Sequence, residues 1–348
     1  MDTEDLELAE DVIELTHGGG GTIMEQLIRG VIVSGVSIRR ALNGVGLDEL
    51  DDGASMKLED HEIVVSMDGH TVDPIFFPGG DIGRLAASGT LNDVAMMGAR
   101  PIALCDSIIV EEGFPISDLR RIVASMDKTA KEIGVAIVGG DFKVMPKERL
   151  DQIVITTCGI GLAKRGQIVV DSGAKPGDKV IVTGSIGDHG IALLAAREGL
   201  GFETELKSDV APIWETVNAA LETGEVNAMK DPTRGGLASA LNEIAGKSKV
   251  SIWLQEEQIS IKESVKAASE MLGLDPFEVT CEGVAAICVS QRQAEVALEA
   301  VRNTKYGKGA QIVGTVKAEK PGYVLLETVV GGTRVIEKPL GEPIPRVC

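Results

Sequence analysis

Short apolar, β-branched runs alternate with segments of helical periodicity along most of this chain, and the alternation predicts strands and helices in turn. In the first half of the sequence, strands are predicted at Ile63–Met67, Ile102–Val110, Val135–Val138 and Ile153–Leu162. Helices are predicted at Gly83–Met97 and Ser117–Ile133. Together these elements indicate one α+β domain over residues 45–165.

A turn at Lys175–Asp178 precedes a new buried run, which places the start of a second domain nearby, over residues 166–337. Strands are predicted there at 179–183, 283–289, 311–316 and 322–328. Helices are predicted at 187–199, 209–223, 234–246, 262–273 and 291–302. This order predicts a mixed sheet flanked by helices, so that the whole chain is an α+β protein of two α/β domains.

The two ends of the chain carry weaker patterns. Residues 1–44 hold four successive glycines, Gly18–Gly21, followed by Thr22 and Glu25 at the spacing of a helix capping box. The glycine loop either offers backbone N–H groups to an anion and closes over a cleft, or is a flexible linker. Residues 338–348 contain prolines and a glycine without periodicity, which predicts a flexible, extended tail with a reach on the order of 30 Å.

Composition and charge narrow the class of protein. With 348 residues, 44% hydrophobic, the chain can bury two cores, and a net charge of -19 disfavours nucleic acid and anionic membranes as partners. The acidic start and the absence of a run of about 18 apolar residues predict a cytoplasmic protein. Four of the five cysteines lie in apolar runs, which is typical of reduced core residues: Cys105, Cys158, Cys281 and Cys288.

Acidic residues follow several predicted strands of the first domain. Asp68 follows the first strand, another short acidic turn ends at Asp81, and Asp141 follows Gly139 and Gly140 at the end of a third strand. Each turn alone is an ordinary loop feature, but three together favour a site for Mg²⁺ and a polyphosphate, which need hard oxygen ligands. Lys143 would add a point charge beside a transferring phosphoryl group.

Other candidate groups are less specific. Neither a Walker loop nor a dinucleotide-binding glycine motif is present. Arg234, in a turn that opens a helix, pairs with phosphate or holds the acidic loops. Glu282 is either a general base or an exposed glutamate beside a strand, and Cys348, the last residue, is either a reactive group or an unused thiol on a frayed end.

Six stretches in this order resemble the HypE hydrogenase maturation factors, which share a superfamily with aminoimidazole ribonucleotide synthetase and selenophosphate synthetase. The stretches cover nearly the whole chain, and the cysteine-ended tail is the specific one, although HypE tails often have isoleucine in place of Val347. They are Thr16–Gly21, Asp68–Val72, Asn92–Ala99, Gly139–Val144, Asp231–Gly236 and Pro345–Cys348.

The resemblance implies a homodimer in which two copies of the first domain form a β-barrel, with ATP bound near the interface. It also implies that HypF carbamoylates Cys348, that ATP drives dehydration of this group to a thiocyanate, and that the cyano group passes to iron on HypC and HypD. The site residues it implies are catalytic Cys348, Lys143 and Glu282, nucleotide-binding Gly19, Gly20, His70, Asn92, Gly140 and Arg234, and the Mg²⁺ ligands Asp68, Asp93 and Asp141.

Two other kinds of function stay open at this point. The chain could be another ATP-dependent kinase or synthetase of the superfamily, such as thiamine phosphate kinase, which needs no terminal thiol. Selenophosphate synthetase would place a reactive cysteine in the early glycine loop, whereas the first cysteine here is Cys105. A non-catalytic carrier that presents a loaded cysteine would need no nucleotide site.

Overall fold

A computed structural model describes residues 12–197, 205–341, 343–344 and 346–348. The first eleven residues of the predicted N-terminal segment lie outside this part. The last two residues of the helix predicted at 187–199 lie outside it too, as do Glu342 and Pro345 of the predicted tail. No helix in the described part is both long and apolar enough to cross a membrane.

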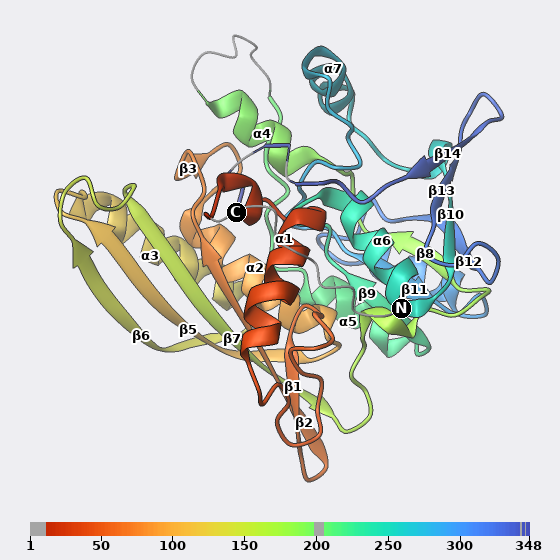
Figure 1. Ribbon diagram of the computed structural model, residues 1–348, viewed down its shortest axis with the longest axis horizontal. Coiled ribbons are helices and arrows are strands. Elements are labelled where there is room, and N and C mark those ends of the chain that lie inside the picture. The colour runs from red at the N-terminus through yellow and green to blue at the C-terminus, as the bar shows by residue number, and fades with distance from the viewer. Residues whose placement is uncertain (1–11, 198–204, 342, 345) are drawn as a thin grey trace.

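The first domain is built on a five-stranded sheet with the order β1-β2-β7-β5-β6. All neighbours are antiparallel except β5 and β6, which the crossover helix α3 connects in parallel. Figure 1 shows the strands fanned out beside the second domain, with α2 and α3 packed against the sheet. The elements are β1 (Ala54–Leu58), β2 (His61–His70), β5 (Arg100–Glu111), β6 (Ala136–Met145), β7 (Ile153–Lys164), α2 (Ile82–Met96) and α3 (Ile116–Glu132).

The four strands and two helices predicted for this domain are confirmed, and most are longer than predicted. β1 was missed because its sequence, Ala-Ser-Met-Lys-Leu, has too few β-branched residues to stand out locally. The two-residue strands β3 (Phe76–Phe77) and β4 (Gly80–Asp81) were also missed. The described sheet stays open: no closed barrel forms within the described part of one chain.

The second domain contains a seven-stranded mixed sheet with the order β14-β13-β10-β12-β8-β11-β9. β10 and β13 are parallel and the other neighbours antiparallel, so the predicted mixed sheet is confirmed. Its strands are β8 (Lys179–Val182), β9 (Val226–Lys230), β10 (Ser251–Gln255), β11 (Ala286–Val289), β12 (Gln311–Lys317), β13 (Val324–Glu327) and β14 (Thr333–Ile336). Its helices are α4 (Asp188–Ala196), α5 (Trp214–Glu222), α6 (Gly236–Ser248), α7 (Glu263–Leu272) and α8 (Ala294–Arg302).

Helix α2 joins the two domains. Nearly every side chain along it is buried, because one face packs on β2 and β7 while another meets α5 of the second domain. Ala95 and Met96 share a core cluster with Ile213 and Val217 across this boundary. A helix that is apolar on all sides is typical of the interior of a large protein. The two domains therefore share buried apolar contacts rather than a flexible hinge.

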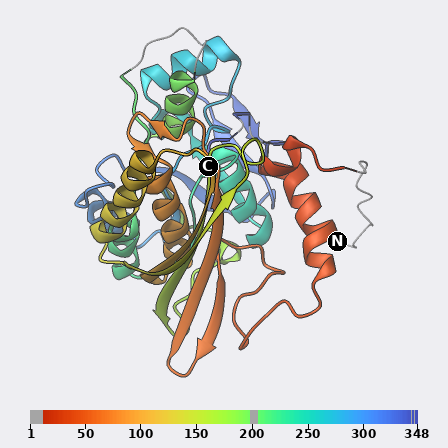
Figure 2. The same cartoon turned by 90° about the vertical axis from the view of Figure 1, so that its left-hand side faces the viewer.

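The N-terminal helix differs from the predicted capping box. Helix α1 (Gly21–Leu27) begins two residues earlier than the capping box predicts, and its N-cap is Gly20 with φ of 72° instead of Thr22. A π-helical segment, Ile28–Val33, continues it along the outside of the molecule, as Figure 2 shows. The backbone N–H groups of Thr22 and Ile23 donate to carbonyl oxygens of the C-terminal tail, at 3.0 and 3.1 Å. Contact with the tail therefore satisfies two N–H groups in the first turn of this helix.

Candidate active site

A cavity of about 360 Å³ lies where β2 and α2 of the first domain meet α6 of the second, beneath helix α1. Segments from many separate parts of the sequence, in both domains, line it. Seven of the predicted site residues line it: Gly20, Asp68, His70, Asp93, Arg234, Glu282 and Cys348. The fold therefore brings together the glycine loop, the first acidic strand end, the Asp231–Gly236 motif and the terminal cysteine.

Carboxylates dominate one wall of the cavity. Asp68 is at the end of β2, Asp93 on α2, Asp231 directly after β9, and Glu282 ahead of β11. Asp231 and Glu282 are 6% and 4% exposed. One oxygen of each, Oδ2 and Oε1, finds no hydrogen-bond partner among the described residues. A buried oxygen without a donor is costly, so these two point to a missing positive ligand.

The pKa values of these carboxyl groups are raised, which shows that their ionised forms are disfavoured in the cavity. Burial, together with the negative charge of Asp68, raises the pKa of Asp231 to about 7. Burial first, then the charge of Asp231, holds the pKa of Glu282 well above its usual range. Removal from water and the charges of Asp68 and Asp231 do the same to the pKa of Asp93. A cation bound among them would favour their ionised forms.

The donor set fits Mg²⁺ held together with a polyphosphate. All its members are carboxylate oxygens, which Mg²⁺ prefers, and nucleotide-bound Mg²⁺ usually takes only one or two protein ligands besides phosphate and water. Within the described residues, no three His, Cys, Asp or Glu side chains converge as a ready-made cage. Asp68, Asp93 and Asp231 are the residues that could hold the ion beside bound phosphate.

Arg234 supplies the positive charge opposite these carboxylates. The pKa of Arg234 is raised, first by the negative charge of the terminal residue Cys348 and then by Asp68, Glu282 and Asp93. The glycine loop packs on it: a Cβ atom at Gly20 would lie 2.8 Å from the Arg234 Cβ. Gly20 is therefore required for the loop to approach this arginine.

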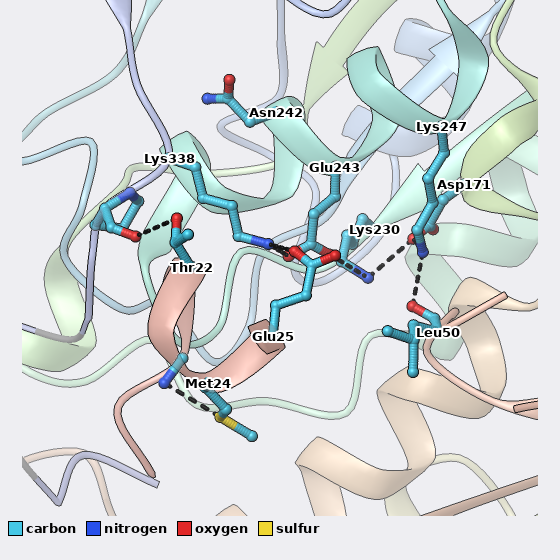
Figure 3. A network of polar contacts seen from close by, with 12 residues as sticks. Thr22, Met24, Glu25, Leu50, Asp171, Lys230, Asn242, Glu243, Lys247 and Lys338 are labelled. Atoms are coloured by element: carbon cyan, nitrogen blue, oxygen red, sulfur yellow. Dashed lines mark hydrogen bonds and ion pairs between the residues drawn. The ribbon is translucent and has the colours of Figure 1, made fainter. Parts of the chain in front are cut away.

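A network of lysines and carboxylates forms the other wall, as Figure 3 shows. Lys338, at the start of the tail, lies between Glu25 of α1 and Glu243 of α6, at 2.7 and 2.8 Å. Glu243 also pairs with Lys230 at the end of β9. Burial alone would raise the pKa of Glu243, but the charges of Lys230 and Lys338 lower it, so the carboxylate stays ionised. These pairs fasten α1 and the tail to the second domain.

The same network continues to the loop ahead of β1. Lys230 pairs with Asp52 and Asp171, and Lys247 on α6 pairs with Asp51 at 3.0 Å and Asp171 at 2.8 Å. Both lysines line the cavity together with their carboxylate partner Asp51 or Asp52. Sequence reasoning did not single out Lys230, Lys247 or Lys338, because nothing local separates them from surface lysines.

His70 closes the end of the cavity near Glu282. It is 4% exposed, its Nε2 lies 3.4 Å from the Thr157 hydroxyl, and its Nδ1 finds no partner among the described residues. Burial lowers the pKa of His70 to about 4, so the ring is neutral at neutral pH. A Cβ at Gly89 would lie 3.1 Å from the His70 ring, so this glycine of α2 makes room for it. The neutral ring has a free polar atom for a ligand.

Five predicted site residues lie outside the cavity of the single chain. Asp141 and Lys143 are on the exposed edge strand β6, where they pair with each other. Gly140 is on the same strand, and a Cβ there would lie 2.7 Å from Asp106 Oδ1, which accounts for the glycine without a ligand. Gly19 ends the turn before α1 and does not line the cavity.

Asn92 supports the cavity from behind. Its amide nitrogen donates to the carbonyls of Ala211 and Glu282, at 3.0 and 3.3 Å, and its oxygen accepts from the Ile213 N–H at 2.9 Å. Asn92 thus ties α2 to the segment that carries Glu282 instead of facing the cavity. The acidic turn at Asp81 has a local function as well, because its carboxylate caps α2 by accepting from the Arg84 N–H.

Cys348 reaches the cavity because the tail folds back onto the protein. The main chain of α1 binds the carbonyls of Pro339 and Leu340, and Ile344 and Val347 are buried at 1% and 2% exposure. The sulfur-bearing residue is half-buried and lines the same cavity as Arg234 and Glu282. In this structure, the tail predicted to be flexible is packed along its described part.

Comparisons with known proteins agree with this architecture. Residues 50–163 match the family model for the N-terminal domain of AIR synthase related proteins, and residues 175–327 match the model for the C-terminal domain. A crystal structure of a HypE–HypF complex superimposes with a TM-score of 0.83 at 42% identity, covering 90% of this chain and 99% of that one. A crystal structure of HypE in complex with ATP gives a TM-score of 0.79 at 40% identity, covering 97% and 100%.

The relatives in sequence are similar over the same extent. The carbamoyl dehydratase HypE of Azotobacter vinelandii is 45% identical over 345 residues, which cover 99% of both chains. Such identity extends over both domains and nearly the whole length of the two chains. The chain belongs to the HypE family of carbamoyl dehydratases.

Proposed function

We propose that this chain is an ATP-dependent carbamoyl dehydratase of [NiFe]-hydrogenase maturation whose substrate is its own Cys348. The observation that carries the proposal is the position of Cys348, which lies in one cavity with Arg234, Glu282 and Asp68. A terminal thiol in an acidic, lysine-lined cavity fits a reaction on that sulfur driven by a bound nucleotide. HypF would load the carbamoyl group, and a HypC–HypD complex would accept the cyanide, in the cytoplasm.

The residues divide the chemistry between them. When bound, Mg-ATP supplies the phosphoryl group that makes the amide oxygen of the S-carbamoyl group a leaving group. Asp68, Asp93 and Asp231 would hold the Mg²⁺, while Lys230 and Arg234 would face the phosphates. Glu282 is placed to take the amide protons as phosphate departs, and its raised pKa makes the carboxylate a stronger base than an ordinary glutamate. Enclosure of the tail protects the thioester-like group from water.

The alternatives fit the cavity less well. A non-catalytic carrier has no use for buried carboxylates whose oxygens lack donors. Another kinase or synthetase of the superfamily would use the same acidic loops, but a folded-back tail would then occupy space needed for its small substrate. The presence of Cys348 among the lining residues favours the dehydratase.

We also infer that two copies of the chain pair through the open sheet of the first domain. Buried and more exposed residues alternate along β7, so the helices cover only one face of this sheet. Large apolar side chains stay exposed on the other face and on the edge strand β6, including Met67 at 68%, Leu162 at 38% and Val138 at 61%. An exposed apolar sheet with an uncovered edge strand is a typical association surface. Pairing of two such sheets would close the barrel.

Such a dimer would also account for Asp141 and Lys143. The strand register places Asp141 level with Ser107 on β5 and Thr156 on β7, in the less buried set of residues. Both would then face the second copy rather than their own cavity. The proposal is that each active site takes Lys143 and Asp141 from the partner copy.

The first experiment tests the reaction itself. The protein is incubated with HypF, carbamoyl phosphate and ATP, and the mass of the C-terminal peptide is measured by mass spectrometry. We expect a carbamoyl adduct on Cys348 without ATP and a thiocyanate with ATP, and neither on the Cys348→Ala variant. Cyanylation of Cys105, Cys158 or the Cys348→Ala protein would overturn the proposal.

The second experiment tests the shared site. We expect the Lys143→Ala and Glu282→Ala variants to be inactive when each is assayed alone. The two variants are then mixed under conditions that allow subunits to exchange. If the two residues act from different copies, mixed dimers contain one intact site and recover part of the activity. If both act within one copy, mixing restores nothing. A folded, inactive mixture with confirmed exchange would therefore reject the shared site without affecting the proposed reaction.

A further inference from the structure

We propose that helix α4 forms a binding site for the C-terminal tail, which we call the seat. In it, His189 and Arg197 position Cys348 by binding the main-chain carbonyls of the two residues before it. The proposal rests on the proposed function, because it takes Cys348 as the reacting residue. Neither residue lines the cavity, so each acts through the tail and is a positioning residue rather than a catalytic one.

His189 makes the tighter of the two contacts. Its ring is fully buried, and Nε2 lies 2.7 Å from the carbonyl oxygen of Val347. A carbonyl can only accept a hydrogen bond, so Nε2 must carry the proton. Nδ1 lies 2.7 Å from the Ser208 hydroxyl, which itself accepts from the Val210 N–H. Ser208 therefore donates to Nδ1 and fixes the tautomer that binds the tail.

The surroundings hold this ring neutral and in place. Burial lowers the pKa of His189 to about 4, so the donor at Nε2 is present without a charge at neutral pH. Phe77 packs edge-on against the ring, with centroids 5.5 Å apart and planes at 90°. A buried imidazole with both nitrogens engaged has a single orientation, which suits a fixed anchoring point.

Arg197, at the C-terminal end of α4, binds the preceding carbonyl. One of its terminal nitrogens donates to the Arg346 oxygen at 3.0 Å, while Nε donates to the Asp73 oxygen at 2.9 Å. The Asp73 N–H also donates to the Arg346 oxygen at 3.2 Å. Two donors from separate segments therefore converge on one carbonyl of the tail.

Apolar contacts complete the seat. Ile344 and Val347 belong to the same core cluster as Ile191 of α4 and Val279. A Cβ at Gly190 would lie 2.5 Å from Val279 and 3.2 Å from the Ile344 Cδ1. Helix α4 thus lacks a side chain where the tail packs against it.

Recognition through carbonyls has a chemical consequence. The seat contacts the backbone of residues 346 and 347 and leaves the sulfur of Cys348 to the cavity. It should therefore hold the tail in the same place whether the sulfur is a thiol, an S-carbamoyl group or a thiocyanate. Because HypF must reach a tail that has left the seat, weakening the seat should spare loading and impair the step that follows.

The experiment measures how often the tail leaves its seat. A maleimide carrying a polymer too bulky for the cavity is added to the full-length protein, and labelling of Cys348 is followed on the C-terminal peptide by mass spectrometry. His189→Leu leaves a buried carbonyl without its donor, so we expect labelling about tenfold faster or more. His189→Gln keeps a side-chain N–H and should restore part of the slow rate. His61→Gln, on an exposed histidine at the start of β2, is the control and should label as the parent does.

A second variant covers the case in which His189→Leu does not fold. Arg197→Leu removes a half-buried side chain and should speed labelling about fivefold, the usual effect of one hydrogen bond. In single turnovers on protein already carbamoylated by HypF, both variants should dehydrate more slowly while their affinity for ATP stays unchanged. Loading by HypF should stay at the parent rate or rise.

The outcomes separate the seat from the reaction. Faster labelling of both variants supports the seat even if no protein forms a thiocyanate, in which case only the proposed function fails. Equal labelling of parent, His189→Leu and Arg197→Leu overturns the seat, whatever the enzyme does. Slower loading in step with slower dehydration would also count against it, since a general loss of structure would then explain both.

Discussion

Substitution of Asp231 by asparagine should make the protein more stable and less able to bind Mg-ATP. Asp231 is 6% exposed, and its Oδ2 finds no hydrogen-bond partner among the described residues. Burying the ionised carboxylate costs free energy, and a bound cation would offset that cost. Removing the charge removes that cost in the free protein and also removes the ligand.

The magnitude follows from the pKa. A rise from 3.8 to about 7 corresponds to a destabilisation of about 4 kcal/mol at high pH, with each pKa unit contributing roughly 1.4 kcal/mol. Below pH 3.8, Asp231 is protonated in the folded and unfolded states alike, so the cost is absent. It grows between pH 3.8 and 7 and is constant above. Because the new amide must also be buried, we expect Asp231→Asn to gain about 2 kcal/mol at pH 8 and little at pH 4.

Urea unfolding at both pH values, at equal protein concentration, measures this difference. Asp171→Asn is the matched control, because Asp171 is 2% exposed but its Oδ2 accepts hydrogen bonds from Lys230 and Lys247. Asparagine there should destabilise the protein, since it replaces an acceptor with a donor. Added Mg-ATP should stabilise the parent more than Asp231→Asn. A loss of stability at pH 8, or a gain of equal size at pH 4, would refute the reasoning.

Four further predictions concern the reaction, the dimer and the network. Lys143→Ala and Glu282→Ala should still bind ATP by calorimetry but dehydrate the loaded tail about 100-fold more slowly or worse; near-normal turnover would remove either residue from the mechanism. Asp141→Asn should weaken Mg-ATP binding in a folded dimer, and unchanged affinity by calorimetry would reject it as a ligand. Val138→Glu should shift sedimentation towards the monomer, and an unchanged dimer would place the interface elsewhere. Lys338→Met should lower the free energy of unfolding by about 1 kcal/mol, because its two glutamate partners keep other cations; no change in urea would show that the pairs contribute little.

Local patterns predicted the elements with strong periodicity. Four strands of the first domain and the helices predicted in both domains have enough β-branched or regularly spaced apolar residues to be recognised. β9, β10 and β14 were missed, and β9 shows why: its sequence, Val-Asn-Ala-Met-Lys, gains its strand character from pairing with β11 rather than from its own residues. Because β9 was not predicted, Lys230 at its end was not recognised as a residue that lines the cavity.

The candidate site was predictable where its residues follow a strand or a glycine turn. Asp68 lies at the end of a buried strand and was assigned to a ligand site from that context, whereas Glu282, ahead of a buried strand, was left as either a general base or an exposed glutamate. Asp141 has the same local context, yet its strand lies at the edge of the sheet. The order of strands in a sheet cannot be predicted from a local sequence pattern. Asp231 opens the motif that contains Arg234, so the motif was found while the acidic residue in it was passed over.

The tail shows how a segment without pattern can still be ordered. Its described residues gain a few hydrogen bonds, at about 1 kcal/mol each, and two buried apolar side chains, at about 2 kcal/mol each. Fixing its backbone costs about 1 kcal/mol or more for each residue. The two sums nearly cancel, so the seated and released states of the tail should lie close in free energy. A substrate arm that must visit a partner and return needs that balance, and strong apolar periodicity in the sequence would have destroyed it.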